Sequence, residues 1–431
     1  MNNEVTIDSV FEVKDLKLDQ NKNFHVLPKD KREEALEIMN HLNFPTTRNE
    51  AWKYTRVAKI KNTPFSISNS ETIDSVSHKL IPGLDGSLLV FVNGFYKPEL
   101  SNIVPETGLS ISPLSDLEAS AWSQKYIGTV ITDEKEEFFS AMNTAYAKDG
   151  VAIKIDKNTA VKDGIQVLFI STGEKIFAAT RNIILCEDFS EAHLTIEFFS
   201  ENANTCFHNT ATEIIVGKNA QITIDKIQNE NESALSVSTE RVKQHQDSTF
   251  YINTITLDGG LVRNNLTIDV AGQNCETNMA GVYILSGKQH VDNNTIVDHQ
   301  VANCNSNELY KGVMSDDSTG VFSGKVFVRK DAQKINAFQS NGNVLIGKNA
   351  SVNSKPALEI YADDVKCSHG STTGQLDEEA IFYLRARGMS ETSARALMVS
   401  AFIMEALEKV ENESVRAYID HVLLEKFGWE F

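Results

Sequence analysis

The feature that most constrains the fold is a long stretch, residues 150–370, built of short strand-like runs and almost free of helix signals. Runs of Val, Ile, Thr and Phe alternate with Gly, Asn and Asp, and Pro356 is the only proline. The pattern of residues 192–196 returns at 220–224, a step of 28, and a similar switch follows 29 residues later at Thr249. Such a repeat predicts the stacked rungs of a parallel β-helix. A β-sandwich is the alternative, but it would favour Asn-Gly hairpin turns, which are sparse here.

Charge and composition exclude several classes of protein. The chain has 59 acidic and 41 basic residues, so its formal net charge is −18, whereas nucleic-acid and anionic-membrane binders need a basic face. No apolar run is long enough to span a membrane, and residues 1–13 lack the pattern of a secretory signal. The five cysteines are far apart and contain no CxxC pair, so neither a disulfide framework nor a structural zinc site is indicated. We therefore expect a cytoplasmic protein.

Three regions are predicted along the chain. Residues 1–145 form an N-terminal helical and mixed region, residues 146–373 the parallel β-helix core, and residues 374–431 a C-terminal helical region. In the first region we expect a helix over residues 29–42 and a buried strand over residues 88–92. The apolar face of the helix is predicted to contain Ala35, Leu36, Met39 and Leu42, and the strand is followed by an Asn93-Gly94 turn.

The C-terminal region predicts three amphipathic helices. Asp377 and Ser390 are good N-caps for the first two, and Gly388 marks the end of the first. The third repeats apolar residues from Val415 to Leu423 at helical spacing. Helices after a β-stack serve either as a cap over its open end or as a docking surface for a partner, and both remain open.

The sharpest chemical cluster, Cys367 and His369, lies at the junction of the β region and the helices. Residues two apart on a strand face the same side. A thiolate and an imidazole together suit iron–sulfur chemistry or zinc, although two ligands do not close a four-ligand site. A partner chain or a distant segment would have to supply the others. The alternative is a buried cysteine beside a structural histidine.

A second cluster contains His290, Asp292, Asp298, His299 and Cys304. The two histidines could face each other across a tight rung, or all these residues could belong to polar ladders between rungs. Asp292 and Asp298 could also act as the acid/base pair of a carbohydrate-active β-helix enzyme.

A third pattern imitates a phosphate-binding loop. Gly342 to Gly347 followed by Lys348 fits the start of that motif, but Asn349 replaces the Ser or Thr that would bind magnesium. We therefore expect no nucleotide site here.

At these motifs the chain resembles the SufB/SufD family of iron–sulfur cluster assembly proteins. The resemblance covers roughly residues 280–430 and rests on four segments: residues 322–325 (FSGK), 355–360 (KPALEI), 366–377 (KCSHGSTTGQLD) and 383–388 (YLRARG). Near the N-terminus, the segment with Arg48, Glu50, Trp52, Lys53 and Tyr54 is similar to the SufD branch, and the cysteine-rich motif of the SufB branch is absent.

The resemblance implies a right-handed parallel β-helix and a scaffold subunit without enzymatic activity. It implies pairing with a SufB-like subunit where clusters form, and docking of a SufC-like ATPase on the C-terminal helices. His369 stands where the SufD branch has its functional histidine, with Cys367 beside it, so the two are expected to be half of a cluster or metal site. We expect no cofactor to stay on the isolated chain, iron or a cluster to bind transiently in the complex, and the free edge to allow a homodimer.

Overall fold

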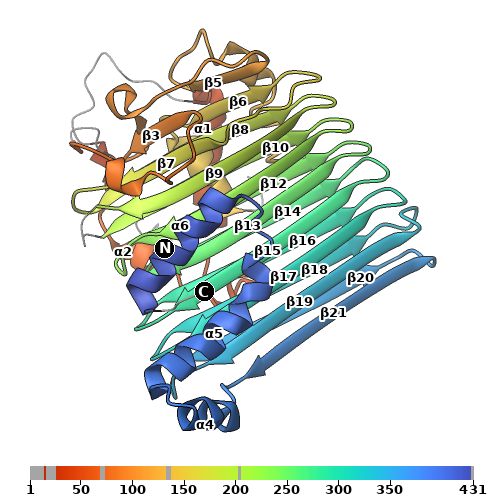
Figure 1. Ribbon diagram of the computed structural model, residues 1–431. Helices are drawn as coiled ribbons and strands as arrows, with labels where there is room; N and C mark the ends of the chain where they lie inside the picture. Colours follow the sequence, from red (N-terminus) through yellow and green to blue (C-terminus); the bar gives the residue numbers. More distant parts are fainter. Residues whose placement is uncertain (1–13, 16–25, 68–72, 133–136, 202–204, 429–431) are drawn as a thin grey trace, which may run out of the picture.

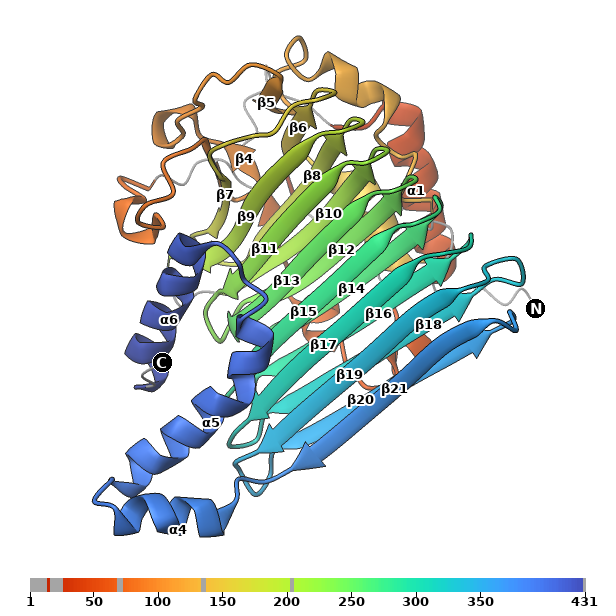
Figure 2. The ribbon, with the colours of Figure 1, turned by 45° about the vertical axis from the view of Figure 1, so that its right-hand side comes forward.

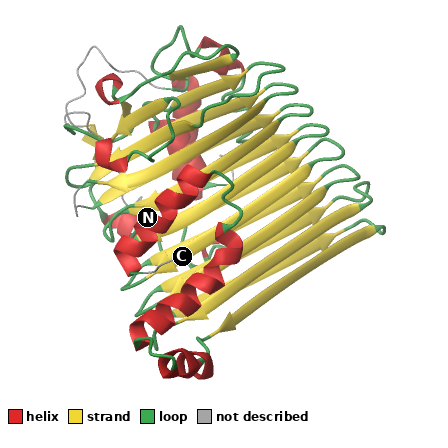
Figure 3. Cartoon of the chain, in the orientation of Figure 1, coloured by secondary structure: helices red, strands yellow, loops and turns green. Residues whose placement is uncertain are grey.

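Two parallel β-sheets wound from one chain form the centre of the molecule, and helices flank them (Figure 1). The structure, a computed structural model, describes residues 14–15, 26–67, 73–132, 137–201 and 205–428. Residues 1–13, where we expected no secretory signal, lie outside the described residues. Strands make up most of the regular structure in the described chain (Figure 3).

The chain passes back and forth between the two sheets, here called sheet A and sheet B. The stacked strands of sheet A are β6 (Val151–Ile155), β8 (Ile176–Cys186), β10 (Cys206–Val216), β12 (Leu235–Gln244), β14 (Leu261–Val270), β16 (His290–His299), β18 (Thr319–Val328) and β20 (Ser351–Ile360). Those of sheet B are β7 (Ile165–Ser171), β9 (Glu191–Ser200), β11 (Gln221–Asn229), β13 (Thr249–Asp258), β15 (Glu276–Leu285), β17 (Asn305–Met314), β19 (Ile335–Leu345) and β21 (Val365–Gly374). Their parallel pairing confirms the predicted β-helix and excludes the antiparallel β-sandwich.

The repeat length differs slightly from the one expected. Ala192 pairs with Ile222, not with Ala220, so this turn takes 30 residues, while the turn from Gln221 to Thr249 takes 28. A shift of two residues leaves every side chain on the same face of its strand, because side chains alternate with period two. The hydrophobic pattern therefore could not distinguish the two registers.

The N-terminal region covers the first rungs and the outer face of sheet A. Its helices are α1 (Lys29–Leu42), α2 (Ala58–Asn62) and α3 (Phe138–Tyr146), and its strands are β1 (Lys14–Asp15), β2 (Ser66–Ile67), β3 (Leu88–Val92), β4 (Phe95–Tyr96) and β5 (Leu109–Pro113). Helix α1 and strand β3 have the predicted bounds, and Asn93 and Gly94 form the predicted turn with positive φ angles of 53° and 82°. Strand β3 pairs in parallel with β7, so this region extends sheet B.

One residue that we predicted on the apolar face of α1 is exposed to solvent. Ala35 and Met39 are buried, but Leu36 is 38% exposed. Ile38 packs against the core instead, together with Leu42. The helix is covered on one side only, mainly by α3. The buried face of the helix is therefore narrower than the face formed by its apolar residues, and Leu36 lies outside it.

The C-terminal helices are α4 (Glu378–Ala386), α5 (Glu391–Leu407) and α6 (Glu413–Phe427). The side chains of Asp377 and Ser390 cap α4 and α5, as predicted. Helix α5 packs on β15 and β17, and together with α6 it covers the outer face of sheet B (Figure 2). The helices therefore line a flank of the β-helix and do not cap its open end. Among the described residues, no helix has the length and apolar character needed to cross a membrane.

Candidate functional site

Cys367 and His369 lie on β21, the last strand of sheet B. They pair in register with Ala337 and Gln339 of β19, which are 0% and 3% exposed inside the β-helix. Side chains of paired residues project to the same face. Cys367 is accordingly half-buried against the interior, and His369 is exposed because no further rung of the described chain lies over it. The structure thus places the predicted pair on the inner face of the last rung.

The two side chains have the chemistry of an incomplete site. Burial raises the pKa of the Cys367 thiol, so a nearby cation is needed to favour its thiolate at neutral pH. The described residues contain no group of three or more His, Cys, Asp and Glu side chains suited to hold a metal ion. A four-ligand cluster or metal would need further ligands beyond those that the described residues bring together here.

A hydrogen-bonded polar network lies directly inside this last rung. Ser371 Oγ donates to Ser354 Oγ at 2.7 Å, and Ser354 Oγ donates to Asn341 Oδ1 at 2.8 Å. Deeper inside, Asn341 Nδ2 donates to Tyr283 Oη at 3.1 Å, and Tyr283 Oη donates to Asn343 Oδ1 at 2.6 Å. The interior next to the open end is therefore partly polar. The sequence signal of this network is the occurrence of Asn, Ser and Thr at alternate positions of the late strands.

A second polar chain lies under His369 itself. Gln339, the register neighbour of His369, donates from Nε2 to Glu308 Oε2 at 2.6 Å, and Thr295 Oγ1 donates to Glu308 Oε1 at 2.6 Å. Burial raises the pKa of Glu308, which favours the neutral acid. A buried carboxyl group therefore lies two rungs below His369, in the same column of register partners.

The N-terminal motif of residues 48–55 docks on the outer face of sheet A. Glu50 forms an ion pair with Lys355 of the edge strand β20. The Trp52 ring lies 4.5 Å from the guanidinium carbon of Arg263, and Thr55 Oγ1 lies 2.9 Å from His290 Nε2. The motif thus bridges several rungs and reaches the edge strand of sheet A, in the last rung of the stack, whose sheet B strand carries Cys367 and His369.

The second predicted cluster does not form a site. Asp292 and Asp298 lie six residues apart on β16, roughly 20 Å at about 3.3 Å per residue, too far for an acid/base pair. Asp292 pairs with Arg263, and Asp298 pairs with Arg329 at 2.8 Å. The carbohydrate-enzyme reading therefore fails.

The two histidines are also kept apart. His290 and His299 occupy opposite ends of the same strand, so the prediction that they face each other is wrong. His299 lies inside and contacts Ser306 Oγ at 2.9 Å, and burial lowers its pKa to about 4. Cys304 is buried and donates to the Gly272 carbonyl oxygen at 3.2 Å.

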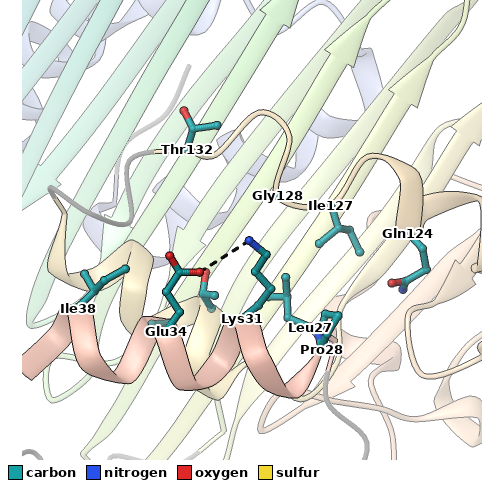
Figure 4. Close-up of a pocket in the computed structure, with 11 residues that line it drawn as sticks. Leu27, Pro28, Lys31, Glu34, Ile38, Gln124, Ile127, Gly128 and Thr132 are labelled. Carbon is teal, nitrogen blue, oxygen red and sulfur yellow. Dashed lines mark ion pairs between the residues drawn. The ribbon is translucent and has the colours of Figure 1, made fainter.

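A groove of about 430 Å³ lies far along the stack, between α1 and residues 124–132 (Figure 4). Leu27, Ile38 and Ile127 supply apolar walls, and the ion pair of Lys31 and Glu34 lies at its side. It contains none of the predicted site residues, and its lining holds no cluster of catalytic side chains. The candidate site residues Cys367 and His369 therefore lie away from this groove, on the last rung.

Comparison with known proteins gives a consistent result over the whole chain. Residues 169–402 match the family described as the SufBD core domain of SUF-system FeS cluster assembly, and residues 1–167 match the SufBD protein N-terminal region. A SufBD family protein of Synechocystis is 30% identical over 403 residues, which cover 90% of this chain and 88% of that protein. The iron–sulfur cluster assembly protein SufD of Escherichia coli is 29% identical over 90% of both chains, and SufD of Bacillus subtilis is 24% identical over 92% and 93%. The chain therefore belongs to the SufBD family of iron–sulfur cluster assembly proteins.

Proposed function

We propose that this chain is a non-catalytic scaffold subunit whose last rung pairs with a SufB-like subunit. Strands β20 and β21 end the two sheets, and their residues are mostly half-buried or exposed along their whole length. An unpaired strand edge is a natural template for another chain. In this arrangement His369 and Cys367 contribute half of the site where a nascent cluster forms, and the partner contributes the rest.

The iron and the cluster are cargo in this proposal, and neither stays on the isolated chain. Two candidate ligands on one strand support transient binding only. The same free edge would allow two copies to form a homodimer when the SufB-like subunit is absent. The five cysteines are all free, which agrees with a reducing compartment such as the cytoplasm.

The C-terminal helices are the proposed docking surface for a SufC-like ATPase. Helix α4 exposes Phe382 and Tyr383 at 73% and 57%, which is unusual for large aromatic side chains. Helix α5 is held to the β-helix by the 2.8 Å ion pair between Lys311 and Glu405. An outside ATPase fits this proposal because the segment that imitates a phosphate loop lies in strand β19 and the turn after it, and strand β20 follows it where a phosphate loop would be followed by a helix.

The observation that carries the proposal is the exposed imidazole of His369 on the inner face of an uncovered last rung. The test is anaerobic reconstitution of the three-subunit complex with iron and a sulfide source, followed by visible absorption. We expect His369→Ala to keep the complex intact by size-exclusion chromatography and to lose most of the cluster absorption. The matched control is Ser368→Ala, whose side chain is also exposed but faces the other side of the strand. Normal cluster absorption in the His369→Ala complex would reject the proposed site.

A further inference from the structure

Two cysteines outside the proposed cluster site occupy the same position on consecutive rungs. Cys275 directly precedes β15, and Cys304 directly precedes β17. Glu276 and Asn305, the residues that follow them, are register partners, and the Asn305 amide donates to the Cys275 carbonyl oxygen at 2.9 Å. Neighbouring parallel strands lie about 4.8 Å apart. This separation is within the range of about 4.4–6.8 Å between Cα atoms that a disulfide bridges.

The two thiols converge on one acceptor. Cys275 Sγ donates to the Gly272 carbonyl oxygen at 3.0 Å, and Cys304 Sγ donates to the same oxygen at 3.2 Å. The interaction between the two side chains lowers the pKa of Cys275 and, together with burial, raises that of Cys304. Cys275 is therefore the sulfur that reacts first as a thiolate, and Cys304 is the thiol beside it.

Burial determines which oxidant can reach this pair. Both cysteines are 0% exposed, and the turn of residues 271–274 passes directly over them. A bulky disulfide reagent is excluded from such a position, whereas hydrogen peroxide is close to water in size. Cys186 and Cys206 are equally buried, but their thiols contact Ser190 and Ser200, so they provide internal controls.

We propose that Cys275 and Cys304 form a reversible disulfide across two rungs when the folded chain meets a peroxide. The Cys275 thiolate attacks one peroxide oxygen, the O–O bond breaks, and hydroxide leaves, which gives a sulfenic acid. The Cys304 sulfur then attacks Cys275 Sγ, and the S–O bond of the sulfenic acid breaks. The departing hydroxide takes up the proton of the Cys304 thiol, so water is released. Two cysteine sulfurs are oxidised by one peroxide, and a dithiol reductant reverses the bond. The proposal does not depend on the role of His369.

The test uses the full, folded chain treated with hydrogen peroxide, then denatured, alkylated and mapped by peptide mass spectrometry. We expect the number of free thiols to fall from five to three, the two lost being Cys275 and Cys304, which appear as one linked peptide pair. Dithiothreitol should restore all five. Five free thiols after treatment, overoxidation without a link, or a link to any other cysteine would each overturn the proposal.

Two serine variants sharpen this test. In Cys304→Ser the sulfenic acid of Cys275 has no resolving thiol, so we expect no linked peptide to form and dimedone, added together with the denaturant so that it reaches the buried sulfur, to trap the sulfenic acid. In Cys206→Ser the linked pair should form as in the unaltered chain. A Cys304→Ser protein in which Cys275 resists dimedone, or a Cys206→Ser protein without the link, would contradict the mechanism.

Discussion

The two ends of the β-helix are built from the same kind of rung, yet their residues are buried to different extents. Every residue of β8 and of β10, near the N-terminal end, is buried. No residue of β20 or β21, at the C-terminal end, is fully buried (Figure 2). The first rungs are covered by α3 and residues 128–131, whereas the last rung has no element beyond it in the described chain.

One column of side chains shows what this difference teaches. Ile184, Ile214, Val242, Ile268, Val297, Val326 and Leu358 follow each other in register from rung to rung of sheet A. The column stays aliphatic to its last member, although Leu358 is only half-buried. At the end of the stack, the core is therefore partly open to solvent. The strand of sheet A still carries the aliphatic column there, and the strand of sheet B carries polar groups and His369. We infer that it is shaped to be covered by a further rung from another chain.

The largest difference between the ends is expected for their ion pairs. At the closed end, Arg181 and Glu213 are both fully buried 2.7 Å apart, and Glu213 also accepts hydrogen bonds from the backbone N–H groups of residues 128, 130 and 131. Glu213→Gln should lower the free energy of unfolding by about 3–5 kcal/mol, because it leaves the guanidinium buried without its counter-charge. At the open end, Glu50→Gln removes the exposed pair with Lys355 and should have no measurable effect. Urea titration measures both, and losses of equal size would contradict the comparison.

A smaller difference is expected within the aliphatic column. Ile184→Ala should cost about 2–5 kcal/mol of unfolding free energy, since the side chain is fully buried and leaves a cavity. Leu358→Ala should cost roughly 1 kcal/mol in the isolated chain, because much of that side chain already meets water. Urea titration at low protein concentration keeps the chain from pairing with itself. If Leu358→Ala costs as much as Ile184→Ala, the last rung is covered in solution.

A pH dependence is expected near the closed end. Burial raises the pKa of Glu197 from 4.5 to about 8, against hydrogen bonds from Gln166 and Tyr418. The folded chain therefore holds a proton that the unfolded chain releases, and this contribution to stability is present below pH 4.5 and lost as the pH rises to about 8. Glu197→Gln should flatten the fall in unfolding free energy across that window, measured by urea titration at several pH values. Glu359→Gln on exposed β20 serves as the control, and an unchanged slope in Glu197→Gln would contradict the assignment.

Local patterns were the part of this molecule that sequence reasoning predicted well. Helix α1 and strand β3 matched their predicted bounds because caps, turn residues and periodicity act within a few residues. Of the two interpretations left open for His290 and His299, the one in which they face each other across a rung is wrong, because one strand continues between them. Leu36 failed for a related reason: no local signal says how wide the covering layer on a helix will be.

The sequence by itself determined that the chain forms stacked parallel rungs, that helices follow them, and that Cys367 and His369 share one face of a strand. Only the tertiary structure decided that this face is the inner one, that no rung covers it, and that the polar chains through Gln339 and Tyr283 lie behind it. The physical reason is that strand periodicity is set by neighbours along the chain. Burial at the end of a stack is set instead by register and by which element lies on the last rung, and those contacts join residues far apart in sequence.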